Sequence, residues 1–200
     1  MNDSFLFLHG LAIKKFGTAG AVASILGTNE SDTRLALERA VEIGEAAFVR
    51  GNFVLIPKGL ERLNKEYTIR FRQVREESAL GEAYEPFEIV NARLKKLMTQ
   101  WQTIEIAGEL LPNDHSDANY DEKIIRRLEE LHDDFEKISL DFVKAVPRLS
   151  RYRERLGEAL GKIDDGLHEY VSGVNVESYH TVWFELHEDL LRMLERVRHE

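Results

Sequence analysis

Residues 33–59 read TRLALERAVEIGEAAFVRGNFVLIPKG, and the stretch divides into two patterns at Gly44. Apolar residues recur at helical spacing before that glycine, at Leu35, Leu37, Ala40, Val41 and Ile43. Two short runs rich in β-forming residues follow, at 47–50 and 53–56, and Gly51 and Asn52 between them are a tight-turn signal. The stretch predicts a helix capped by Ser31 or Asp32 and then a β-hairpin, which Pro57, Lys58 and Gly59 bring to an end.

Two further helices are predicted before this stretch. Residues 5–16 predict a helix that ends at Gly17, with Lys14 and Lys15 in the last turn, where the helix dipole favours cations. Thr18 is a suitable cap for a short helix over residues 19–26, which Gly27 closes. A basic helix is predicted after the hairpin, over residues 60–77. Its cations are expected to form a solvated face, with contact to a DNA backbone as the alternative: Arg62, Lys65, Arg70, Arg72 and Arg75.

The order helix, short helix, turn, helix, hairpin, helix is that of a winged helix-turn-helix. The segments TAGAVASILG and TRLALERAVEIGEAAFVRGNFVLIPKG resemble the MarR-type winged-helix pattern, in which the hairpin closes on LTPxG, here LIPKG. The resemblance implies DNA binding, with residues 31–43 in the major groove and residues 50–53 as the wing. The residues it places against DNA are Arg34, Arg39, Arg50, Asn52 and Lys58.

The charge distribution limits this interpretation. The formal net charge is -9, yet residues 1–60 hold six basic and six acidic side chains, so the whole excess lies after residue 60. The acidic part would repel a phosphate backbone, which leaves residues 1–60 as the possible nucleic-acid surface. Even there, the presumed recognition helix sets Asp32, Glu38 and Glu42 against Arg34 and Arg39. Winged helices also bind proteins, and a protein-binding module is therefore the alternative.

The pattern changes near residue 80, and Gly81 marks the expected boundary between a domain over 1–80 and an all-helical acidic domain over 81–200. Apolar residues at helical spacing predict helices over 84–103, 119–145 and 148–171, and a last helix from residue 177 or 178 almost to the end. Four such helices with short links predict an antiparallel bundle. The expected fold class is mainly α, a winged helix-turn-helix with a small hairpin wing followed by a C-terminal helical bundle.

Polar residues stand beside aromatic ones in three segments of the second domain, WQ at 101–102, NDHSDANYD at 113–121 and SYHTVWFELHEDL at 178–190. These segments resemble an uncharacterised bacterial helical domain that follows a winged helix, and they are similar to regions appended to phosphoenolpyruvate-utilising enzymes. The resemblance implies an architecture and an enzyme of that class as a partner.

Three interpretations of these segments stay open. A small-molecule effector site would use Trp101, Gln102, Asn113, His115, Tyr120, Tyr179, His180, Trp183 and His187. A structural role would have His180 and His187 donate hydrogen bonds to Asp114 or Asp117. A metal site would need His115, His180 and His187 to converge, although a spacing of seven residues separates the last two by about 10.5 Å.

Several kinds of chemistry have no residues to support them. The chain has no cysteine, which excludes disulfides and thiol chemistry, and it contains no GxSxG, P-loop or GxGxxG motif. We therefore expect neither an enzyme nor a cofactor. The apolar run at 5–13 is too short to span a bilayer, so a cytoplasmic protein without membrane contact is expected.

The leading hypothesis is a homodimeric, DNA-binding transcriptional regulator whose helical domain senses a small molecule or dimerises. The alternatives are a non-DNA interaction protein, such as a partner of a phosphoenolpyruvate-utilising enzyme, and a metal-binding helical domain.

Overall fold

The computed structural model describes residues 4–76, 79–106 and 108–197 and is mainly helical, with two small antiparallel sheets. These residues form two compact units, one of residues 4–76 with 185–197 and the other of residues 79–184. The sequence placed all residues after 80 in one domain, whereas in the structure residues 185–197 group with the first unit. In the described part of the chain, no helix is long and apolar enough to cross a membrane.

The first unit begins with helix α1 (Ser4–Lys14), a two-residue strand β1 (Phe16–Gly17) and helix α2 (Ala19–Leu26). Helix α2 confirms the predicted ends, because the Thr18 side chain accepts a hydrogen bond from the amide of Ala21 and Gly27 closes the helix in the left-handed region. The predicted extension of α1 to residue 16 is wrong. Lys15 has a φ of 66°, which ends the helix and turns the chain into β1.

Helix α3 (Glu30–Glu42) begins one residue before Ser31 and two before Asp32, the two predicted caps. The Asn29 side chain, rather than Ser31 or Asp32, accepts the hydrogen bond from a free amide of the first turn, that of Ser31, at 2.8 Å. The predicted caps are therefore wrong, since Ser31 and Asp32 already lie inside the helix.

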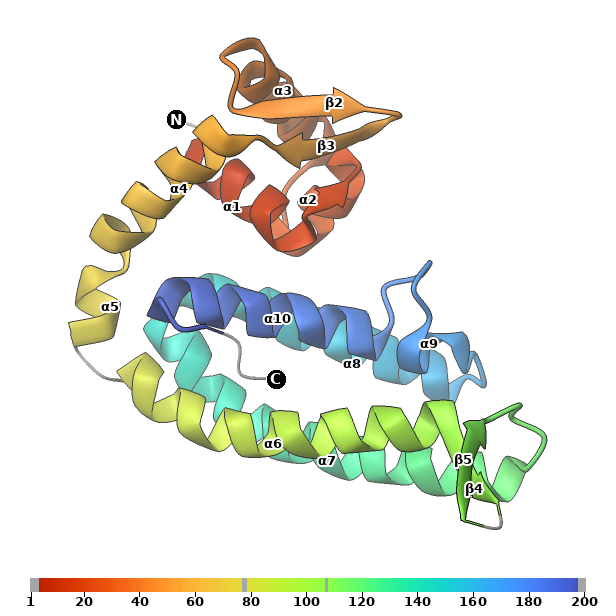
Figure 1. Ribbon diagram of the computed structural model, residues 1–200. Helices are drawn as coiled ribbons and strands as arrows, with labels where there is room; N and C mark the ends of the chain where they lie inside the picture. The colour runs from red at the N-terminus through yellow and green to blue at the C-terminus, as the bar shows by residue number, and fades with distance from the viewer. Residues whose placement is uncertain (1–3, 77–78, 107, 198–200) are drawn as a thin grey trace. The chain divides into compact units, whose positions relative to one another are not determined.

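Strands β2 (Ala46–Val49) and β3 (Asn52–Leu55) form the expected hairpin, and β1 pairs with the other edge of β3 (Figure 1). The two turn residues are Arg50 and Gly51, with φ angles of 51° and 83°, and not Gly51 and Asn52. Positive φ at both central positions is typical of the type I′ turn that suits the twist of two paired strands. Asn52 instead pairs with Val49 as the first residue of β3.

Helix α4 (Pro57–Arg70) starts at Pro57, and the shorter α5 (Arg72–Glu76) follows it. The prediction that Pro57 to Gly59 precede the helix is wrong, because proline at the first helical position lacks only an amide that has no helical partner there. The core of the unit contains Leu11, Val22, Leu37, Phe53 and Leu63, and residues 185–194 at the end of helix α10 (Tyr179–Leu194) belong to the same unit.

The second unit contains helices α6 (Ala79–Gln102) and α7 (Ala118–Ala145), which lie side by side (Figure 1). Arg93 on α6 pairs with Asp134 on α7 at 2.7 Å, and Arg127 on α7 donates to the Gln100 side chain at 2.8 Å. Strands β4 (Thr103–Ile106) and β5 (Glu109–Pro112) form a hairpin between the two helices, where the sequence predicted only a loop.

The predicted helix over 148–171 is wrong as a single element. A short 3-10 turn (Pro147–Leu149) leads into α8 (Ser150–Asp164), and the separate α9 (Glu169–Ser172) follows. Gly166, with a φ of 85°, ends the helical path between them. Helix α10 begins at Tyr179, close to the predicted start. The core of the unit is aromatic, since the Trp183 ring stacks on Phe87 and meets Phe135 edge-on.

Candidate functional site

The five residues predicted to contact DNA lie on α3, on the β2–β3 hairpin and at the start of α4. Arg34, Arg39, Arg50 and Lys58 are exposed. The Lys58 ammonium donates to the carbonyl of Ile43 at 2.6 Å, and the Asn52 side chain donates to the carbonyl of Arg50 at 3.2 Å. Lys58 therefore stabilises the C-terminal end of α3, and Asn52 stabilises the hairpin turn.

The exposed face of α3 is acidic. It carries Glu30, Asp32, Glu38 and Glu42 against Arg34 and Arg39, and Arg34 is paired with Glu30 at 3.0 Å. Among the described residues the remaining three carboxylates and the Arg39 guanidinium have no ion-pair partner. Three unpaired negative charges against one positive charge do not form a cationic surface.

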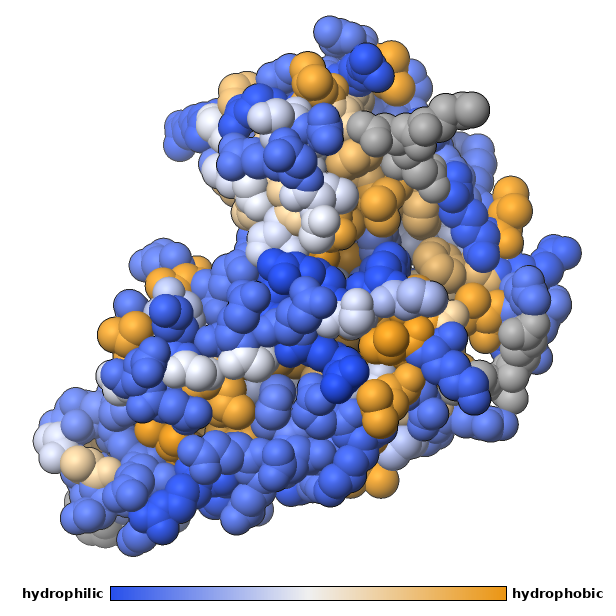
Figure 2. Space-filling view, turned by 180° about the vertical axis from the view of Figure 1, so that it is seen from behind, coloured by the Kyte–Doolittle hydropathy of each residue, from blue (hydrophilic) through white to orange (hydrophobic). Residues whose placement is uncertain are grey.

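Large apolar side chains are exposed on the same part of the first unit. Leu35 on α3 and Ile43 at its C-cap are 56% and 54% exposed, and Phe48 on β2 is 52% exposed. The space-filling view also shows apolar residues at the surface, among hydrophilic ones (Figure 2). A groove of about 150 Å³ lies between α1 and α3, with Phe7, Leu8, Leu35, Ala36, Ala40 and Ile43 among its lining residues.

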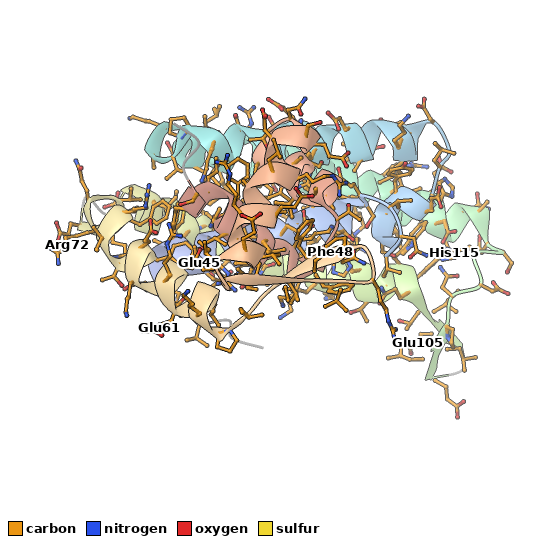
Figure 3. The ribbon with its side chains drawn as sticks, turned by 90° about the horizontal axis from the view of Figure 1, so that it is seen from above. Glu45, Phe48, Glu61, Arg72, Glu105 and His115 are labelled. Carbon is orange, nitrogen blue, oxygen red and sulfur yellow. The ribbon has the colours of Figure 1, made fainter. Side chains whose placement is uncertain are left out.

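Charged side chains lie at the edge of this groove. Asp32, Arg39 and Glu45 line it together with the apolar residues. Glu45 precedes β2, and Phe48 lies on that strand (Figure 3). The Glu45 carboxylate accepts a hydrogen bond from Arg62 at 2.8 Å, so its charge is compensated within the unit.

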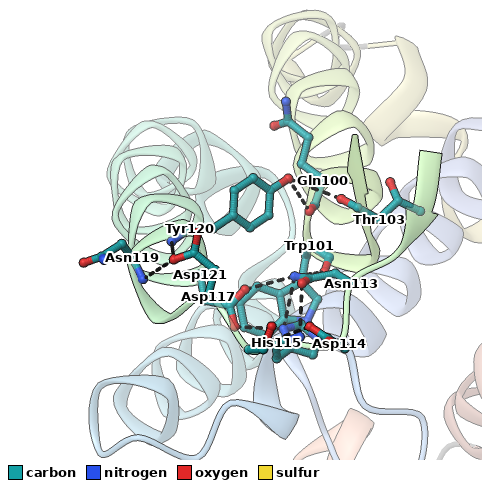
Figure 4. Close-up of polar contacts among 11 residues, drawn as sticks. Gln100, Trp101, Thr103, Asn113, Asp114, His115, Asp117, Asn119, Tyr120 and Asp121 are labelled. Carbon is teal, nitrogen blue, oxygen red and sulfur yellow. Dashed lines mark hydrogen bonds and ion pairs between the residues drawn. The ribbon is translucent and has the colours of Figure 1, made fainter. Parts of the chain in front are cut away.

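Four of the nine predicted ligand residues gather in the second unit, at the end of α6, on the loop before α7 and on the first turn of α7 (Figure 4): Trp101, Asn113, His115 and Tyr120. The Asn113 amide donates to the carbonyl of Trp101 and to Oδ1 of Asp121, both at 3.0 Å. Nδ1 of His115 lies 2.9 Å from Oδ2 of Asp121, and the His115 ring lies on Trp101 with the centroids 4.5 Å apart. Tyr120 donates its hydroxyl to the carbonyl of Gln100 at 2.9 Å.

The contact with Asp121 assigns a hydrogen to Nδ1 of His115. An ionised carboxylate only accepts hydrogen bonds, so Nδ1 is the donor to Oδ2 of Asp121, and the amide nitrogen of Asn113 lies 3.2 Å from the same ring nitrogen. The Asp121 side chain is 5% exposed, whereas His115 is 41% exposed. With the hydrogen on Nδ1, the Nε2 atom of His115 can accept a hydrogen bond.

The other five predicted ligand residues lie elsewhere. Tyr179 and Trp183 are buried in the core of the second unit, where Trp183 donates to the side chain of Asn91 at 3.0 Å and the Tyr179 hydroxyl lies 3.2 Å from Nδ1 of His132. Burial raises the pKa of Tyr179 well above its usual value and lowers the pKa of His132. Gln102 is exposed.

The two remaining histidines do not hold the loop as predicted. His180 is half-buried in the second unit, which lowers its pKa, and His187 is buried in the first unit. Asp114 and Asp117 accept backbone amides of their own loop and of α7. His115 connects the loop to α7 through its contact with Asp121. In the described part of the chain, no group of three or more histidine or acidic side chains is arranged to hold a metal ion.

A buried polar cluster in the first unit was missed by the sequence analysis. His9 on α1 lies between the Tyr67 hydroxyl, 2.5 Å from Nδ1, and Asp189, 3.3 Å from Nε2. Nearby on the same helices, Lys14 pairs with the buried Glu185 at 2.9 Å. A histidine inside the apolar run FLFLHGLAI was the available signal, but its partners are distant in sequence.

No model of a protein family, no curated protein and no solved structure matches the chain significantly.

Proposed function

We propose that the first unit is a winged helix-turn-helix that binds a protein rather than DNA, and that the second unit is an antiparallel helical bundle. The observation that carries this proposal is the exposed face of α3, where three carboxylates and one guanidinium have no ion-pair partner among the described residues. DNA presents one negative charge per about 1.7 Å of helix axis, so a helix with this balance is repelled from the major groove.

The apolar side chains on the same face support a protein partner. Leu35, Ile43 and Phe48 are each more than half exposed. Leu35 and Ile43 also line one groove together with Asp32 and Arg39, and exposed apolar side chains rimmed by polar ones are typical of protein-interaction surfaces. The resemblance of the polar segments 101–102, 113–121 and 178–190 to regions appended to phosphoenolpyruvate-utilising enzymes makes an enzyme of that class the first partner to test.

The experiment is a pull-down with the purified full chain, followed by titration of the captured protein in purified form. We expect one protein to be retained by the wild type and lost with Leu35→Asp. The matched control is Ile89→Asp, which places the same charge on an exposed isoleucine of α6 in the second unit and should retain the partner. Equal capture by all three proteins would contradict the proposal.

A DNA-binding regulator acting as a homodimer is the second candidate, because Arg39 and Arg50 are exposed on α3 and at the hairpin turn. Fluorescence anisotropy against duplex DNA at low salt separates the two functions. We expect no binding beyond weak association that 200 mM salt abolishes. Binding that persists and is lost with Arg39→Ala and Arg50→Ala would establish the regulator instead.

A further inference from the structure

We infer that the groove between α1 and α3 binds a basic amphipathic helix of a partner protein, with one large apolar side chain inserted in the groove. This inference rests on the proposed protein-binding function and adds the chemistry of the partner. Three features of the groove support it: its size, the length of its apolar edge and its charge.

The groove has the size of a single side chain. Its volume is about 150 Å³, and a cavity of that size is known to hold one benzene molecule. Phe7 and Leu8 from α1 and Ala36 and Ala40 from α3 line it, and the two alanines leave the space that a larger residue would fill. One leucine, isoleucine or phenylalanine of a partner therefore fits, whereas a drug-sized ligand needs at least about 300 Å³.

The apolar edge of the groove is longer than one side chain. Leu35 on α3 and Ile43 at its C-cap both line it, and eight residues at the helical rise correspond to about 12 Å. That distance equals about two turns of a second helix, whose apolar positions i, i+4 and i+7 would face α3. A helix laid in a groove is a common mode of peptide recognition and uses this spacing.

The charges at the groove favour a basic partner. Asp32 lines the groove, and Glu38 and Glu42 are exposed on the same helix, while Arg39 is the cation among them. The Glu45 charge is already compensated by Arg62. An incoming helix with lysine or arginine beside its apolar positions complements the three carboxylates, and an acidic helix is repelled.

Two synthetic 15-residue helical peptides test the inference. They share one leucine stripe at positions i, i+4 and i+7 and differ only in having lysine or glutamate at the flanking positions. Binding to the full chain is measured by fluorescence anisotropy at 50 and 150 mM salt. We expect the lysine peptide to bind and the glutamate peptide to bind at least tenfold more weakly.

Two sets of variants separate binding in the groove from general attraction to an acidic protein. Ala36→Trp fills the groove and should weaken binding of the lysine peptide at least tenfold. Ala36→Leu, a smaller change, should weaken it less, and circular dichroism verifies that both variants are folded. The triple variant Asp32→Lys, Glu38→Lys, Glu42→Lys should reverse the peptide preference.

The matched triple variant reverses acidic side chains on α8, and should leave the preference unchanged: Glu154→Lys, Glu158→Lys and Asp164→Lys. If both triple variants lose the lysine peptide equally, or if Ala36→Trp binds like the wild type, the inference is wrong. The pull-down keeps this result distinct from the proposed function. A partner that Leu35→Asp loses, together with absent peptide selectivity, would retain the protein-binding function and reject the basic helix.

Discussion

Oδ1 of Asp189 lies 3.3 Å from Nε2 of His9, and both side chains are fully buried. The opposite ring nitrogen of His9 contacts the hydroxyl of Tyr67, so one imidazole links α1, α4 and the end of α10 within the first unit. Buried polar groups are costly unless they are hydrogen-bonded. The cluster joins the segment 185–197 to the N-terminal helices, as does the pair of Lys14 with Glu185.

Replacement of Asp189 by alanine should lower the free energy of unfolding by about 3 kcal/mol, because it removes one partner from a buried polar pair. Urea unfolding followed by far-ultraviolet circular dichroism measures the change. The control is Glu158→Ala, whose side chain is 65% exposed and which should change stability by less than about 0.5 kcal/mol. Equal effects of the two substitutions would mean that the His9 contact contributes little.

Two glycine-to-alanine substitutions should have opposite signs. A Cβ atom at Gly59 would lie 2.0 Å from the carbonyl oxygen of Glu45, whereas one at Gly157 on α8 meets nothing within 4 Å. Gly59→Ala should therefore destabilise by about 3 kcal/mol through a backbone clash. Gly157→Ala should stabilise by about 0.5 to 1 kcal/mol through helix propensity. Thermal unfolding of both variants measures the two changes in stability. A Gly59→Ala variant as stable as the wild type would mean that α4 lies farther from Glu45.

The hairpin turn offers a stabilising substitution that also removes a predicted DNA contact. Arg50 has a φ of 51°, which asparagine adopts more readily, and Arg50→Asn creates the Asn-Gly pair preferred in type I′ turns. We expect a gain of about 0.5 kcal/mol and undiminished partner capture. Arg50→Val is the contrasting variant, because a β-branched residue disfavours positive φ, and it should destabilise. Loss of stability in Arg50→Asn would argue against the type I′ turn.

The Asp121 carboxylate, which contacts His115, should be the main stabilising group of the loop before α7. Asp121→Ala leaves the Asn113 amide and Nδ1 of His115 without their acceptor and should cost about 2 kcal/mol. Asp114→Ala removes one exposed contact to the amide of Ser116 and should cost less than about 1 kcal/mol. Tryptophan fluorescence measures both, because Trp101 contacts the His115 ring. Equal costs would show that Asp121 has no special role.

The local signals in the sequence were sufficient for most helices. Thr18 and Gly27 mark the ends of α2 because capping is a contact between near neighbours. The hairpin was predicted one residue out of place, since Arg50 can adopt positive φ although glycine and asparagine are the usual residues there. The β4–β5 hairpin was missed although residues 103–106, TIEI, alternate polar and β-branched apolar residues before the turn at Gly108.

The candidate sites were only partly predictable for a different physical reason. Asn113, His115 and Tyr120 lie close together because they are within eight residues of one another, on the loop before α7 and on its first turn. Contacts such as that of His9 with Asp189 depend on packing between distant segments, which a single sequence does not encode locally. The groove between α1 and α3 depends in the same way on how two helices pack.

Acid should destabilise the second unit through His132 and His180. Burial lowers the pKa of both imidazoles below 6.5, although Glu136 and Asp133 oppose this at His132. Each therefore binds fewer protons when folded than when unfolded, so its contribution is complete above pH 6.5 and is lost as pH falls toward the lowered folded pKa. We expect the free energy of unfolding to fall between pH 7.5 and 5.5, as followed by fluorescence of Trp101 and Trp183, both in this unit.

The slope of that pH dependence tests the assignment to these two histidines. The double variant His132→Gln, His180→Gln cannot take up the two protons, so its free energy of unfolding should change less between pH 7.5 and 5.5. His168→Gln is the control, because this histidine is exposed, and it should keep the wild-type slope. The hydrogen bond with Arg153 lowers the pKa of Glu136 from the ordinary value of 4.5. Because the pH window lies above 4.5, Glu136 does not contribute to the slope. A double variant with the wild-type slope would assign the pH dependence to other groups.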